Sequence, residues 1–176
     1  IGESTLGGKD LWFDEVLGRL NYDNRGNYLG KFESKDSLLL IRDNAVYSIL
    51  KVDLNYRFKS SETKILEKFN VGSTVSCMYY DGDSKNYFIK RFGIETKTLN
   101  KEFIFINEFR GTKMLLVSTD DSPVFKFNYH SSNGTKKTKS INVVEFVEVK
   151  GWKSRGNKVP NLKRMSGFEL LEKEVI

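Results

Sequence analysis

The feature that most constrains the fold of this chain is a succession of short segments rich in β-branched and aromatic residues. Such segments are typical of β-strands, and each is bounded by residues that favour turns. A helix of more than two turns is hard to place, and residues 62–69 are the best candidate. We predict an all-β fold with strands at residues 37–41, 45–50, 73–80, 87–92, 103–106, 113–117, 124–127 and 141–149.

The predicted strands recur as strand, turn and strand, which indicates internal repeats. With Asp36, Ser73, Thr112 and Ser140 as equivalent starting points, the spacings are 37, 39 and 28 residues. These spacings approach the period of about 40–50 residues of propeller blades. We therefore expect about four radially arranged repeats, with hairpins at residues 36–49, 72–92, 112–127 and 139–159. A β-sandwich is the alternative, but it would give no reason for the self-similarity.

Length and composition favour one folded domain across residues 1–176, with 39% hydrophobic and 13% aromatic residues. Because the first residue is Ile1 and not a methionine, we expect this domain to be a segment of a longer polypeptide. The longest apolar run, residues 38–41, is far shorter than the ~20 residues of a membrane-spanning helix. With no secretory signal and a single cysteine, the expected location is the cytoplasm.

The net charge of +6 is concentrated in one part of the chain. Residues 133–164 hold nine lysines and arginines against two glutamates, which gives +7 there and leaves −1 for the rest. Such a local positive field attracts nucleic acid or an acidic protein surface. A solvated basic face with no partner is the alternative interpretation.

Within this segment, residues 150–158 combine cations with two glycines and one tryptophan. Lysine and arginine suit phosphate contacts, and Gly151 and Gly156 permit a close approach of the backbone. Trp152 can either anchor the loop in the core or cover a sugar-phosphate edge, and we expect the anchor because an exposed tryptophan is costly. No recognition helix is available to enter a major groove, so we predict contacts with the backbone of duplex DNA.

No catalytic constellation can be assembled from the sequence. His130 is the only histidine and has no evident partner for acid–base chemistry. Cys77 lies inside an apolar strand, where a buried structural thiol is expected. Residues 81–83 lack the spacing of a calcium loop, and residues 6–10 lack two required positions of a P-loop. We expect no catalytic residue, no metal and no cofactor in this domain.

Two stretches of the sequence resemble a known family. One runs from Val149 to Lys158, and the other joins Leu11-Trp12-Phe13-Asp14 to residues 17–21 and 25–30. Together they resemble the C-terminal domain of the A subunit of bacterial type IIA topoisomerases. The resemblance implies a β-pinwheel, which is a propeller-like disc of about four four-stranded blades. In such a disc neighbouring blades exchange strands, and duplex DNA bends against a basic outer rim.

Within this family, the chain is more similar to the A subunit of topoisomerase IV than to the A subunit of DNA gyrase. The gyrase box, Gln-Arg-Arg-Gly-Gly-Lys-Gly, is missing from the sequence. Residues 153–158 are at most a degenerate version of it, and residues 6–9 retain only Gly-Gly-Lys. The resemblance therefore implies a domain that captures or orients DNA for relaxation and decatenation. The alternatives are a gyrase domain that wraps DNA and a propeller-like module that binds an acidic protein.

The resemblance also implies the partners of this domain. The active-site tyrosine of the family belongs to another domain, so this domain would not cleave DNA. Its parent would be an ATP-dependent type II topoisomerase associated with the nucleoid. Expected partners are duplex DNA, the ATPase B subunit of the holoenzyme and the catalytic domain of the same subunit, with no membrane. The candidate DNA-binding residues are Lys136, Lys137, Lys139, Lys150, Lys153, Arg155, Lys158, Lys163 and Arg164, with Arg19, Arg25 and Lys31 as an extension.

Overall fold

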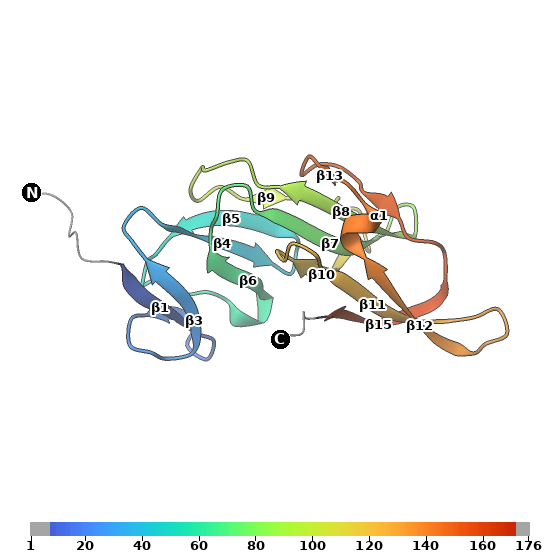
Figure 1. Cartoon of the computed structure of the whole chain (residues 1–176), viewed down its shortest axis with the longest axis horizontal. Helices are drawn as coiled ribbons and strands as arrows, with labels where there is room; N and C mark the ends of the chain where they lie inside the picture. Colours follow the sequence, from blue (N-terminus) through green and yellow to red (C-terminus); the bar gives the residue numbers. More distant parts are fainter. Residues whose placement is uncertain (1–7, 172–176) are drawn as a thin grey trace, which may run out of the picture. The chain divides into compact units, whose positions relative to one another are not determined.

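The computed structural model describes residues 8–171, and Figure 1 shows that strands make up most of this part of the chain. The helices described there are the 3-10 turn η1 (Ser60–Glu62) and the single-turn helix α1 (Val143–Phe146). The all-β prediction is therefore confirmed.

Contacts divide the chain into two compact units, and each is described by itself. Unit 1 comprises residues 1–70 and 96–103, and unit 2 comprises residues 71–95 and 104–176. The expectation of a single domain stays a prediction.

Sheet I of unit 1 forms where no strand was predicted. Its order is β2-β1-β3, with strands at Lys9–Asp14 (β1), Arg19–Asn21 (β2) and Asn27–Phe32 (β3). The Asp14 carboxylate closes the turn between β1 and β2, because it accepts from the N–H groups of Val16 (3.0 Å) and Leu17 (3.2 Å). β2 has three residues and β3 is largely exposed, so neither carries a strong apolar pattern.

Sheet II of unit 1 contains the predicted hairpin at residues 36–49. Its order is β6-β4-β5-β9, with strands at Ser37–Arg42 (β4), Val46–Lys51 (β5), Thr63–Lys68 (β6) and Phe103–Ile104 (β9). The helix candidate at residues 62–69 was wrong, since pairing with β4 satisfies the backbone of β6 and outweighs a weak helical preference. The seven buried residues that join sheets I and II are Leu11, Phe13, Leu20, Phe32, Leu38, Leu40 and Phe58.

Sheet III of unit 2 is built on the predicted hairpin at residues 72–92. Its order is β10-β7-β8-β13, and β14 also pairs with β8. The strands lie at Thr74–Asp81 (β7), Asn86–Gly93 (β8), Lys113–Ser118 (β10), Val149–Lys150 (β13) and Asn157–Lys158 (β14).

Sheet IV of unit 2 has the order β12-β11-β15, with strands at Val124–His130 (β11), Lys136–Asn142 (β12) and Lys163–Leu171 (β15). One core cluster joins it to sheet III, and its buried members are Met78, Ile89, Phe125, Phe127, Ile141, Val143, Val147 and Val159. The described chain therefore forms four sheets, in agreement with about four repeats. They contain three, four, five and three strands, where four strands each had been expected.

Two of the four predicted hairpins were wrong. β10 and β11 do not pair with each other, because β10 completes sheet III beside β7 and β11 forms the centre of sheet IV. The strand predicted at residues 141–149 stops at Asn142, whose side chain accepts from the Glu145 N–H (3.4 Å) and caps α1. The second half of the fourth hairpin, including the basic loop, pairs instead with β8.

Candidate nucleic-acid interface

The basic loop, which we define as Lys150–Lys158, begins and ends on the same strand. β13 pairs parallel with β8 at Arg91 and Phe92, and β14 pairs antiparallel with β8 at Phe88 and Ile89. Between these two short pairings the backbone leaves β8 and returns to it. Both ends of the loop are thus fixed by sheet hydrogen bonds, which limits the conformations available to its lysines.

Lys90 supports the middle of the basic loop from inside unit 2. Its side chain is 1% exposed, and Nζ donates to the carbonyl oxygens of Trp152 (2.7 Å) and Phe105. Nζ also lies 5.3 Å from the ring centroid of Phe92 and 5.9 Å from that of Phe105. Burial lowers the pKa of Lys90 to about 8, with a smaller opposing effect from Cys77, its partner on β7. Sequence reasoning missed Lys90, although a lysine inside an apolar strand was the available signal.

Gly156 lets the loop lie directly on β8. Its φ is +88°, and a Cβ atom there would overlap the carbonyl oxygen of Ile89 and come within 2.8 Å of the Lys90 Cβ. Gly151 has open space around its Cα atom. The predicted close approach therefore exists at Gly156 alone, and it is made with the protein's own strand.

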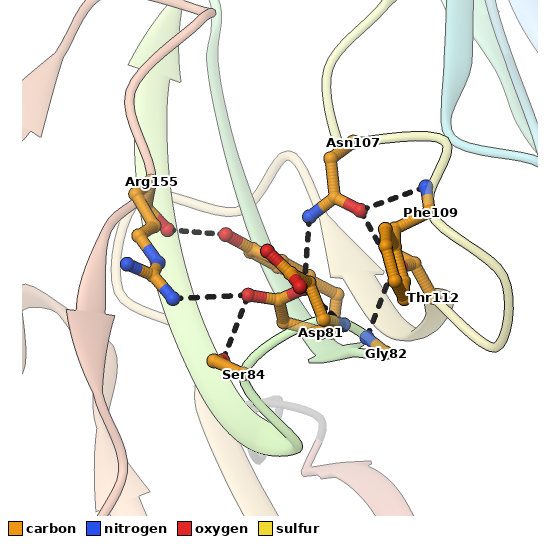
Figure 2. A network of polar contacts seen from close by, with 9 residues as sticks. Asp81, Gly82, Ser84, Asn107, Phe109, Thr112 and Arg155 are labelled. Carbon is orange, nitrogen blue, oxygen red and sulfur yellow. Dashed lines mark hydrogen bonds and ion pairs between the residues drawn. The ribbon is translucent and has the colours of Figure 1, made fainter.

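Asp81 holds the far end of the loop through Arg155, as Figure 2 shows. Its side chain is 4% exposed, and Oδ2 accepts from the Arg155 guanidinium (3.0 Å) and the Ser84 hydroxyl (2.8 Å). Oδ1 accepts from the Asn107 side-chain amide (3.1 Å) and the Asp83 N–H (3.0 Å). Burial alone would raise the pKa of Asp81, but these four hydrogen bonds outweigh it and lower the pKa below its ordinary value.

The same network ties the turn after β7 to the segment before β10. The side-chain oxygen Oδ1 of Asn107 accepts from the Thr112 hydroxyl (2.7 Å) and the Phe109 N–H (3.0 Å). The Thr112 hydroxyl in turn accepts from the Gly82 N–H (2.9 Å). Asp81 is thus the centre of a hydrogen-bond network that joins three segments distant in sequence: the turn after β7, the segment before β10 and the basic loop. The interpretation of residues 81–83 as a hairpin turn is confirmed.

Arg155 makes several contacts within unit 2, although its side chain is 59% exposed. Besides its ion pair with Asp81, its Cζ atom lies 4.5 Å from the centroid of the Phe88 ring. Its carbonyl oxygen accepts from the Tyr79 hydroxyl (2.5 Å). Arg155 therefore acts as an anchor of the loop, and its proposed contact with DNA remains a prediction.

The three lysines of the loop, Lys150, Lys153 and Lys158, are exposed. Among the ion pairs of the described residues, none involves these lysines. Lys153 Nζ lies 5.0 Å from the centroid of the Trp152 ring, and Trp152 itself is half-buried, in line with its expected role as an anchor. The loop thus presents three cations whose charge no carboxylate within the described part of unit 2 neutralises.

The other candidate residues of unit 2 lie on sheet IV, where strand alternation divides them between two faces. Lys137 and Lys139 pair with Tyr129 and Phe127 and share the face of the core, and Lys139 is half-buried. Lys136 pairs with His130 on the opposite face, to which Lys126, Asn128 and Thr138 also belong. We call it the polar face. Lys163 also pairs with His130, from β15, and Arg164 follows it with φ of +54°.

The remaining candidates, Arg19, Arg25 and Lys31, belong to unit 1 and are exposed. Arg25 pairs with Asp23 (3.3 Å), and both residues line a cavity of about 340 Å³ together with Arg19 and Asp14. The mixed charge of this cavity does not favour an anion over a cation. Nine of the twelve candidates therefore lie in unit 2 and three in unit 1.

The environments of Cys77 and of the metal-ligating side chains can be described within residues 8–171. Cys77 is buried, and burial raises the pKa of its thiol to about 12, so the structural interpretation is confirmed. Within residues 8–171 no group of three metal-ligating side chains is assembled, and no helix is long and apolar enough to cross a membrane. Residues 6 and 7 of the P-loop comparison lie outside the described residues.

Comparison with known proteins gave one result. The family model described as "Topoisomerase C-terminal domain, Bacteroidota" matches residues 19–164. That range includes the basic loop, the Asp81 network and most of the polar face. Neither the search of curated proteins nor the search of solved structures returned a match.

Proposed function

This chain belongs to the topoisomerase C-terminal domain family of Bacteroidota, and on that premise we propose that it binds and bends duplex DNA without catalysing a reaction. The observation that carries this proposal is the basic loop. Its three lysines are exposed and without ion pairs, and both ends of its backbone are fixed on β8. Lysines held in this way can neutralise phosphates and release counterions from DNA, whatever the base sequence.

In finer terms, we propose that the domain belongs to the A subunit of a topoisomerase IV. There it would present DNA segments to the strand-passage core of an ATP-dependent enzyme whose catalytic residues lie in another domain. Its partners would be the catalytic domain of the same polypeptide and the ATPase B subunit. The absence of a gyrase box from the sequence supports this choice over a gyrase domain that wraps DNA.

The test is fluorescence anisotropy of the chain on a labelled duplex of about 40 base pairs over a salt series, because counterion release predicts a linear log–log fall of affinity. Replacing Lys150, Lys153 and Lys158 by alanine should weaken binding to all sequences and reduce the slope by about 2–3. The matched control is the replacement of Lys35, Lys64 and Lys97, which removes the same charge from exposed positions outside the candidate set.

Equal losses in both triple variants would show that only net charge matters and would contradict the role of the loop. Absence of binding at low salt would refute the DNA-binding function. In that case, capture of an acidic protein that survives nuclease treatment would favour the interaction module. Positive writhe that depends on the protein in a plasmid-relaxation assay would favour the gyrase alternative.

A further inference from the structure

We propose that the polar face of sheet IV contains a phosphate-binding site centred on His130, and that protonation of His130 makes DNA binding depend on pH. This inference rests on the proposed function, because the phosphate is a backbone phosphodiester of duplex DNA. It goes beyond the lysines and arginines identified from the sequence, among which His130 was not included.

The site is a row of three basic side chains on three neighbouring strands. His130 of β11 lies between Lys136 of β12 and Lys163 of β15, and cross-strand partners project from the same face. Adjacent strands are about 4.8 Å apart, so the two lysines flank the imidazole at a separation that one phosphate group can bridge. The neighbouring pair on the same face, Asn128 and Thr138, shows that paired side chains of β11 and β12 project to one side of the sheet. The Thr138 hydroxyl donates to the Asn128 side-chain oxygen (3.0 Å).

Two bulges in β15 create this row. Lys126 pairs with Glu169, Asn128 with Ser166 and His130 with Lys163, so β15 advances three residues for every two of β11. A regular strand continued from the first pair would set Met165 opposite His130. The bulges carry positive φ values at Arg164 (+54°) and Gly167 (+61°), and a non-glycine residue seldom adopts this conformation. The backbone therefore accepts an uncommon conformation and places Lys163 beside the imidazole.

The charged residues that strand register sets beside His130 are positive. Lys136 and Lys163 are its neighbours across the sheet, and Lys126 is the only other charged residue on the same face of β11. The hairpin loop at residues 131–135 has no charged residue, and β10, which contacts β15, has only Lys113. The nearest carboxylate on this face, Glu169, is opposite Lys126, two rows away.

The imidazole itself is incompletely bonded. Its Nδ1 atom is buried and has no hydrogen-bond partner among the described residues. Buried polar atoms almost always have a partner, and an unpaired one calls for an explanation. Because Nδ1 is covered in the free protein, the side chains around it have to shift for an anionic oxygen between the two lysines to accept from a protonated imidazole. A bound phosphate favours that protonation, because it places a negative charge beside the imidazole.

We therefore expect His130 to take up a proton when DNA binds. An imidazole ordinarily titrates near pH ~6.5, within the range where a neighbouring charge decides its state. A phosphate that prefers the protonated form raises the midpoint of titration, and each unit of that rise is a tenfold gain in affinity at low pH. DNA affinity should therefore increase as the pH falls, although the DNA phosphodiesters themselves keep their charge.

The test uses the whole chain and a duplex with hydroxyl ends, so that no terminal phosphate titrates. Between about pH 7.5 and about pH 5.5 we expect affinity to rise three- to tenfold at fixed salt. His130→Gln should lose most of this rise, and Lys163→Gln should reduce it. The control Lys35→Gln, which removes one exposed cation from unit 1, should keep it.

Because His130 is the only histidine, its Cε1–H resonance reports the same event without a variant. Addition of DNA should move its titration midpoint to higher pH. An unchanged midpoint, or an equal pH effect in His130→Gln, would overturn this inference while DNA binding itself stands. An equal shift with inorganic phosphate at matched phosphate concentration would indicate a site for free anions and would contradict the assignment to DNA. No binding at either pH would instead refute the proposed function.

Discussion

The basic loop and the polar face of sheet IV take their cations from the same basic segment but hold them in different ways. The loop has irregular backbone between two pairings of two residues each, and its shape depends on the buried side chains Lys90 and Asp81. The polar face depends on register, because β11 and β12 pair along seven consecutive residues. Clustering of charge in the sequence therefore does not show whether buried side chains or strand register hold the charged residues in place.

This comparison predicts that single substitutions beneath the loop cost far more than single substitutions on the polar face. Asp81→Ala should have the largest effect, because it leaves the donors of Ser84, Asn107 and Arg155 without their acceptor. We expect a loss of about 3 kcal/mol in the free energy of unfolding, less than for a fully buried ion pair since Arg155 is half in solvent. Urea unfolding at neutral pH measures it.

The matched control is Asp83→Ala in the same turn. Asp83 contributes its N–H group to the network, while its side chain is exposed and the substitution keeps the N–H. The change in unfolding free energy should stay within about 0.5 kcal/mol. Similar losses in the two variants would contradict the assignment of Asp81 as the centre of the network.

A smaller effect concerns pH and the buried amine beneath the loop. The folded pKa of Lys90 is about 8, below the ordinary value of about 10.5, so between these values the unfolded chain holds more protons than the folded one. Stability should therefore rise with pH in this window. From about pH 8 to about pH 9.5 the contribution of Lys90 is about 1–2 kcal/mol.

The difference between the wild type and Lys90→Met isolates this contribution, because other groups that titrate in the window are common to both. The unfolding free energy of the variant should lack the rise, as measured by urea unfolding at several pH values. Parallel pH profiles for the two proteins would show that Lys90 keeps its ordinary pKa in the fold.

The smallest effect is expected on the polar face. Thr138→Val removes the hydrogen bond to Asn128 but keeps a β-branched side chain at an exposed strand position. The free energy of unfolding should fall by about 0.5–1 kcal/mol, as measured by the same urea titration. A loss as large as that of Asp81→Ala would remove the contrast between the two regions.

The sequence predicts the local parts of this architecture well. The hairpins β4–β5 and β7–β8 are recognisable because each joins neighbouring strands through a turn of Asp, Asn and Gly residues. The cluster of positive charge is also recognisable, because it follows from the numbers of charged residues in residues 133–164. In both cases the signal lies within a short window of sequence.

The parts that the sequence did not predict depend on distant partners. β10 pairs with β7 and not with the adjacent β11, and no periodicity within β10 distinguishes these choices. Lys90 is stabilised by carbonyl groups 15 and 62 residues away, and Asp81 by an arginine 74 residues away. The residues that position the loop, Lys90 and Asp81, were therefore not identified from the sequence. The cations that they position were recognisable from the sequence as a charge cluster.

The place of β9 in sheet II has a consequence for synthesis on the ribosome. β9 lies beside β5, and the bridge between Ile49 and Leu99 and the hydrogen bond from Asn100 N–H to the Ile49 carbonyl (2.8 Å) extend this contact. The β7–β8 hairpin is translated between these two segments. Nascent chains therefore expose the edge of β5 for several seconds, at about 5–20 residues per second, before its partner emerges. That interval is when a chaperone would protect the edge from pairing with another chain.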